Sequence, residues 1–63
     1  MDYIEQVRKD KNISVTELCN IIGVQRTTYY KWLNKERKPK IDKILGMCKV
    51  LNIDFAQYVE KFL

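Results

Sequence analysis

The stretch that decides the fold of this chain is Ser14-Val-Thr-Glu-Leu-Cys-Asn-Ile-Ile-Gly-Val-Gln-Arg-Thr-Thr-Tyr-Tyr-Lys-Trp-Leu33. Ser14 and Glu17 have the spacing of a capping box, in which both side chains bond the free backbone N–H groups at a helix start. Apolar residues then recur at helical spacing, at Val15, Leu18, Cys19 and Ile22. Gly23 stands where a left-handed residue commonly ends a helix. The pattern predicts a short helix that ends at Gly23.

A second helix is predicted to follow at once, over about 26–34, with Gln25 as its N-cap. Tyr29, Trp32 and Leu33 share one face, which we expect to be buried. The residues left on the outer face are polar or cationic apart from one tyrosine: Arg26, Thr27, Tyr30, Lys31 and Asn34. Two short helices joined by a tight turn with a glycine form a helix-turn-helix, here about residues 14–34.

Three further helices are predicted around this pair. In the first, over about 2–10, one face carries Tyr3, Ile4 and Val7, while Glu5, Arg8 and Lys9 are expected to face solvent. The fourth, over about 41–51, has an apolar stripe at Ile41, Ile44, Leu45, Cys48 and Leu51. Gly46 weakens this helix, so we expect a neighbouring helix to cross closely there. Asp54 is the expected cap of a fifth.

Length and composition indicate a single domain over 1–63. The chain has 63 residues, 46% of them hydrophobic, which suits one compact all-α domain of five helices. No apolar run approaches the ~18 residues that span a bilayer. The acidic, mixed N-terminus does not resemble a signal peptide, so a cytoplasmic protein is expected.

Enzymatic chemistry is not expected from this composition. The chain has no histidine, and its two cysteines, Cys19 and Cys48, lie in apolar stripes. We therefore expect two buried free thiols and no metal site, since a zinc site needs about four ligands. Neither a nucleophile motif nor a glycine-rich phosphate loop is present, and no cofactor or small-molecule ligand is expected.

Positive charge is concentrated in one segment. The net charge is +4, but residues 26–43 alone hold seven Lys or Arg against two acidic residues. The remaining residues carry five basic and six acidic side chains. Such a run often forms only a solvated surface. Beside a helix-turn-helix it favours binding to a polyanion, because binding needs a local positive field.

In its order of motifs the chain resembles the Cro/CI-type (XRE, lambda-repressor-like) helix-turn-helix family over nearly its whole length. The matching features are the start and turn of the first motif helix, the aromatic residues of the second, and the flanking junctions: Ser14, Glu17, Leu18, Gly23, Val24, Tyr29, Trp32, Asn34, Pro39 and 51–53. The resemblance implies a compact five-helix domain that binds a palindromic double-stranded DNA operator as a homodimer. Regulators of this kind, often repressors, are encoded by bacteria, phages and mobile elements, and are nucleoid-associated when bound.

The resemblance also assigns roles to residues. It implies base contacts by Gln25, Arg26, Thr27 and Tyr30. Contacts to the DNA backbone are implied for Ser14, Thr16, Thr28, Lys31, Asn34, Lys35, Arg37, Lys38 and Lys40. The chain departs from the family pattern at Val15, where Gln is frequent, at Gln25 in place of a small cap, at Leu33 in place of an acidic residue, and at Cys19 in place of Ala.

Side-chain chemistry agrees with these roles. Arg26 can donate two parallel hydrogen bonds to guanine, Gln25 can pair with adenine, and the Thr27 methyl can pack on thymine. Tyr30 either reaches DNA with its hydroxyl or packs, partly buried, against the basic loop. On the predicted fifth helix the apolar residues either form a dimer interface or close the core; the interface candidates are Phe55, Tyr58, Phe62 and Leu63.

Two other functions use the same features. The chain can be a protein-interaction module, such as an antirepressor, whose basic face contacts an acidic partner. It can also be a non-specific architectural DNA binder, although it has no basic tail. A sequence-specific regulator is favoured because the outer face of the predicted second motif helix carries Arg26, Thr27 and Lys31 rather than exposed Leu, Met or Phe.

Overall fold

The computed structural model describes residues 1–63 and contains five helices and no strand. The helices are α1 (Asp2–Asp10), α2 (Val15–Ile22), α3 (Arg26–Leu33), α4 (Ile41–Leu51) and α5 (Phe55–Phe62). This confirms the predicted all-α architecture. The bounds agree with those predicted, except that Asn34 caps α3 instead of lying inside it.

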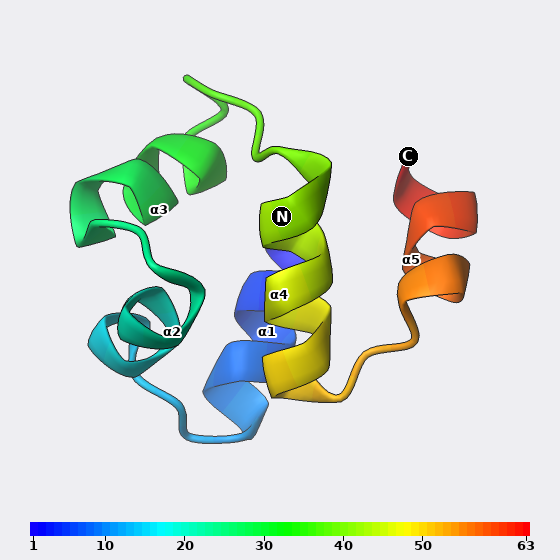
Figure 1. The fold of residues 1–63 in the computed structure, drawn as a ribbon, viewed down its shortest axis with the longest axis horizontal. Coiled ribbons are helices and arrows are strands. Elements are labelled where there is room, and N and C mark those ends of the chain that lie inside the picture. The colour runs from blue at the N-terminus through cyan, green and yellow to red at the C-terminus, as the bar shows by residue number, and fades with distance from the viewer.

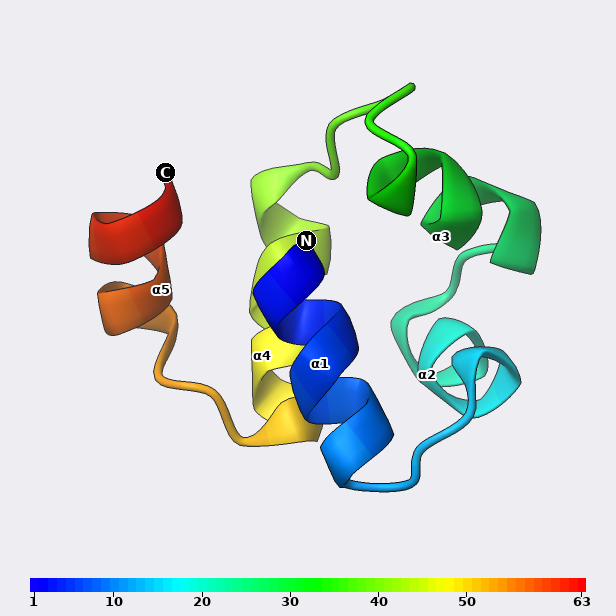
Figure 2. The ribbon, with the colours of Figure 1, turned by 180° about the vertical axis from the view of Figure 1, so that it is seen from behind.

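The helices are arranged around a central pair. α1 and α4 lie against each other, α2 and α3 stand on one side of them, and α5 stands on the other (Figures 1 and 2). All five helices contribute to one core: Ile4, Leu18, Cys19, Tyr29, Trp32, Ile44, Met47, Cys48, Leu51 and Tyr58. The helix-turn-helix is thus held on one flank, with the outer side of α3 free.

Helix ends are set by local hydrogen bonds, as the sequence predicts. The backbone N–H of Glu17 donates to Ser14 Oγ at 3.0 Å, and the N–H of Ser14 donates to Glu17 Oε1 at 3.2 Å. Gly23 has a φ of 76°, the left-handed conformation expected at the turn. Asp54 caps α5 by accepting from the N–H of Gln57. Each such cap is worth about 1 kcal/mol.

The predicted close approach at Gly46 is confirmed, and α2 is the neighbour. A Cβ atom on Gly46 would lie 3.3 Å from Cγ2 of Ile22. One turn earlier in α4, Lys43 Nζ donates to the Ile22 carbonyl at 3.0 Å and satisfies one of the free C=O groups at the end of α2. α4 therefore fixes the C-terminus of the first motif helix.

Two assignments of buried residues were wrong. Ile41 begins α4 and is 55% exposed, whereas Met47 is fully buried. The reason is that α4 packs against α1, α2 and α5, so its buried face is wider than a single stripe. Tyr3, expected on the buried face of α1, is 47% exposed and stacks on Phe62 with ring centroids 5.5 Å apart.

The prediction that Glu5 and Arg8 face solvent was also wrong. Their side chains are only 18% and 12% exposed and form a bidentate ion pair, with both N···O distances at 2.8 Å. Tyr29 of α3, which is fully buried, donates its hydroxyl to Glu5 Oε1 at 2.6 Å. A pair of polar residues at i, i+3 is therefore turned inward, where it meets a buried hydroxyl.

Acid should lower the free energy of unfolding, because it protonates the Glu5 carboxylate. Its hydrogen bond with Arg8 lowers the pKa of the Glu5 carboxyl below the ordinary value of 4.5, against the opposing effect of burial. The unfolded chain therefore binds more protons in this range, so stability rises with pH and is lost as pH falls through the folded pKa. We expect the free energy of unfolding, measured with urea between roughly pH 3 and pH 6, to decline toward acid.

The matched variants are Glu5→Gln, which should flatten this decline, and Glu60→Gln, which changes an exposed carboxylate outside the cluster and should keep it. An equal acid dependence in Glu5→Gln and in the unmodified chain would contradict the assignment to Glu5.

The structure also shows the state of the two thiols and the length of the helices. Cys19 and Cys48 are buried free thiols, as predicted, and burial raises the pKa of both. Their thiolate forms are therefore scarce at neutral pH. None of the five helices is long and apolar enough to cross a bilayer.

Candidate nucleic-acid interface

The two faces of α3 differ sharply. Tyr29 and Trp32 are buried in the core, at 0% and 5% exposure. The four residues implied as base readers are all exposed: Gln25, Arg26, Thr27 and Tyr30. Tyr30 is 48% exposed, and its ring meets Tyr29 edge-on at 6.1 Å. Because Arg26 and Tyr30 are four residues apart, they lie on the same face of the helix.

A hollow of about 390 Å³ separates the start of α3 from α2. Thr16 and Asn20 of α2 line one side, and Gln25, Arg26 and Thr27 line the other. The model thus brings Thr16 next to the implied base readers. Asn20 was not predicted here, although its i+4 spacing from Thr16 places both on one face of α2.

The cations after the start of α3 are not neutralised. Both ion pairs in the molecule involve Glu5, at Arg8 and at Lys9. None of the exposed cations of α3 and the loop that follows it has a carboxylate within salt-bridge distance: Arg26, Lys31, Lys35, Arg37, Lys38 and Lys40. Glu36 is the one acidic residue among them. This surface therefore keeps its full positive field toward solvent.

Lys35 adopts an unusual backbone conformation at the end of α3. Its φ is +63°, a left-handed value that Gly or Asn adopts with less strain. The N–H of Lys35 donates to the Trp32 carbonyl at 3.2 Å, and the N–H of Glu36 donates to the Lys31 carbonyl at 2.9 Å. This is a Schellman motif with lysine at the position that glycine usually fills. The other non-glycine residues with positive φ are both asparagine, Asn12 and Asn52.

Replacing Lys35 with Gly should change stability and DNA binding in opposite directions. We expect Lys35→Gly to raise the free energy of unfolding by about 1 kcal/mol, because glycine removes the left-handed strain. If Lys35 contacts a phosphate, as the resemblance implies, the same change should weaken DNA binding and reduce its salt slope by about 1. Urea unfolding and salt-dependent binding titrations measure the two effects. Lys35→Asn is the matched control and should also lose the contact; a fall in stability for Lys35→Gly would contradict this account.

The remaining residues with implied backbone contacts lie at the margins of this surface. Ser14 Oγ accepts in the capping box, which leaves its O–H free to donate. Thr28 is half-buried, and Asn34 is exposed at the end of α3. Lys40 is the N-cap of α4 and is exposed.

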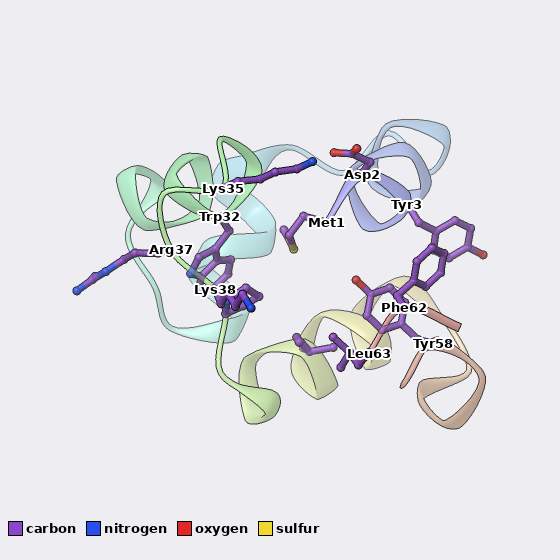
Figure 3. A pocket seen from close by; sticks show the side chains of 12 residues that line it. Met1, Asp2, Tyr3, Trp32, Lys35, Arg37, Lys38, Tyr58, Phe62 and Leu63 are labelled. Carbon is purple, nitrogen blue, oxygen red and sulfur yellow. The ribbon is translucent and has the colours of Figure 1, made fainter. Parts of the chain in front are cut away.

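The interface candidates of α5 fall into two groups. Tyr58 is buried in the core and Phe55 is half-buried, whereas Phe62 and Leu63 are 48% and 67% exposed. Beside them lies a half-open cavity of about 630 Å³ between α5, the start of α1 and the basic loop (Figure 3). Lys35, Arg37 and Lys38 line its loop side, but Arg37 points away from it (Figure 3).

Comparison with known proteins gives one match. The family model HTH_3, described as helix-turn-helix, matches residues 4–58, most of the chain. No curated protein and no solved structure matches this chain. The matched span includes α2, α3 and the unpaired cations that follow them. The chain therefore belongs to the Cro/CI-type (XRE, lambda-repressor-like) helix-turn-helix family of DNA-binding regulators.

Proposed function

We propose that this protein is a sequence-specific regulator, acting as a repressor, that binds double-stranded DNA as a homodimer and reads the major groove with α3. The observation that carries the proposal is the outer side of α3. Together with the basic loop after α3, it combines hydrogen-bonding side chains at the helix start with six exposed cations that have no acidic partner.

In the proposed complex the start of α3 reads bases. Arg26 donates two hydrogen bonds to O6 and N7 of a guanine, and Gln25 pairs with an adenine. The Thr27 methyl contacts a thymine methyl, and the Tyr30 hydroxyl contacts a phosphate or a base edge. The exposure of all four side chains, without a hydrogen bond to the protein, supports this role.

Backbone contacts supply most of the affinity in this proposal. The basic loop and the two motif helices follow the phosphates on either side of α3, through Ser14, Thr16, Thr28, Lys31, Asn34, Lys35, Arg37, Lys38 and Lys40. Each neutralised phosphate releases counterions, so affinity should fall steeply with salt.

Dimerisation is proposed because one domain of this size covers only about 600–1,000 Å² of its surface on DNA. The exposed apolar strip formed by Tyr3, Phe62 and Leu63 supports a second copy at α5, with Phe55 and Tyr58 behind it. A two-fold axis there would place half-sites about one helical turn apart, roughly 34–36 Å.

Phe62→Glu tests this interface. We expect the variant to sediment as a monomer at concentrations where the unmodified protein is a dimer, because a charge at the centre of an apolar contact is costly. Its affinity for a full palindrome should fall more than its affinity for a half-site. Ile21→Glu, at an exposed apolar residue of α2, is the control for oligomeric state. A dimer that survives Phe62→Glu would place the interface elsewhere.

Selection of bound duplexes from a random DNA pool tests the function as a whole. A recurrent palindromic motif is the expected result. Binding that stays weak and independent of sequence would instead favour a protein-interaction module that uses the basic face for an acidic partner.

A further inference from the structure

In addition to its core contacts, the helix-turn-helix is joined to the rest of the molecule by three side-chain hydrogen bonds. Arg8 Nη1 of α1 donates to the Ile13 carbonyl at 2.7 Å, just before α2. Lys43 of α4 donates to the Ile22 carbonyl at the end of α2. The third bond, at 2.6 Å, joins the Tyr29 hydroxyl of α3 to Glu5 of α1. Each motif helix is thus tied to a charged residue of the central pair.

The Tyr29 bond is the one side-chain hydrogen bond by which α3 reaches another element. α3 has eight residues, too few to be stable as an isolated helix, so its orientation depends on its contacts. Glu5 is itself held in place by two bonds from Arg8. The acceptor for Tyr29 is therefore a fixed point on α1 rather than a mobile surface carboxylate.

Two of the proposed base-reading residues are close to Tyr29 along α3. Arg26 precedes Tyr29 by three residues, and Tyr30 is the next residue along the helix. A bidentate base contact requires N···O distances of about 2.7–3.2 Å, so a small shift or rotation of α3 is enough to break it. Backbone contacts from mobile lysine side chains tolerate the same shift.

We propose that Tyr29 and Glu5 are positioning residues for specific DNA recognition: their hydrogen bond sets the orientation of α3 in the groove without touching DNA. This rests on the proposed function. It assigns to α1, outside the motif, control over sequence discrimination but not over general affinity for DNA.

The test compares Tyr29→Phe with the unmodified protein on a duplex selected from the random pool and on a scrambled duplex of equal length. Both proteins are studied where circular dichroism shows them folded, since the phenylalanine ring keeps the core filled. Tyr29→Phe should lose roughly tenfold in affinity for the selected duplex, at the lower end of what one bidentate contact discriminates. Its affinity for the scrambled duplex should not change.

Two controls separate positioning from stability. Cys48→Ala removes a buried side chain of α4 and lowers stability, but should leave both affinities unchanged once the protein is folded. In the double variant Arg26→Ala with Tyr29→Phe, the loss of affinity for the selected duplex should be smaller than the product of the two single losses, because part of the effect of Tyr29 passes through Arg26.

The outcomes are distinct. Equal preference for the selected duplex in Tyr29→Phe and the unmodified protein, or losses that multiply in the double variant, would overturn the positioning role alone. An unmodified protein without any preference for a duplex would overturn the proposed function, and this inference with it.

Discussion

Arg26→Ala should relax the sequence preference of this protein at one position of each half-site while leaving its fold intact. Arg26 is exposed at the first position of α3, and its side chain makes no hydrogen bond or ion pair within the chain. Its removal therefore costs the folded protein little. If Arg26 contacts a guanine, the loss should be about 1–3 kcal/mol for each half-site, or roughly 5- to 150-fold in affinity for one half-site.

The measurement is a second selection from the random pool, followed by titrations on the selected duplex. Relaxed preference at one position of each half-site is the expected signature of a lost base contact. Lys49→Ala is the matched control, because it removes one positive charge from the last turn of α4, away from α3. A uniform loss over all duplexes would instead make Arg26 a phosphate contact.

Arg8→Met should strongly destabilise the fold. It deprives Glu5 of its bidentate partner and the Ile13 carbonyl of its donor at once. Leaving one charge of a largely buried pair without its partner costs about 3 kcal/mol or more. A domain of this size has a total stability of roughly 3–9 kcal/mol, so the substitution should remove a large part of it.

Urea unfolding followed by circular dichroism measures this effect. Lys9→Met is the matched control, since Lys9 is 62% exposed and its Nζ lies 3.9 Å from Glu5. That exposed pair should contribute less than about 1 kcal/mol. Similar midpoints for the two variants would show that the Arg8–Glu5 pair does not hold α1 to the motif.

The helices could be predicted from sequence because their ends depend on neighbours in the chain. Ser14 and Glu17 cap each other three residues apart, and Gly23 and Asp54 act within one turn. The exposed face of α3 follows from the same periodicity, since Tyr29 and Trp32 fix which side is buried.

What could not be predicted depends on how helices far apart in sequence are rotated against each other. Glu5 and Tyr29 are separated by 24 residues, and no local pattern indicates that they meet. Met47 is buried because α1, α2 and α5 pack around α4. The left-handed conformation of Lys35 could not be predicted either, because lysine does not favour it. The base contacts and the dimer interface involve molecules outside the chain, so they stay predictions.

The division of α3 into a packed side and a free side bears on how such a protein can change over generations. Tyr29 and Trp32 carry the core contacts, whereas Gln25, Arg26 and Thr27 carry none. Substitutions at these three positions therefore avoid the large stability losses that follow from disturbing a core. If these positions read bases, successive replacements on the outer side can change the preferred operator with little effect on the stability of the fold.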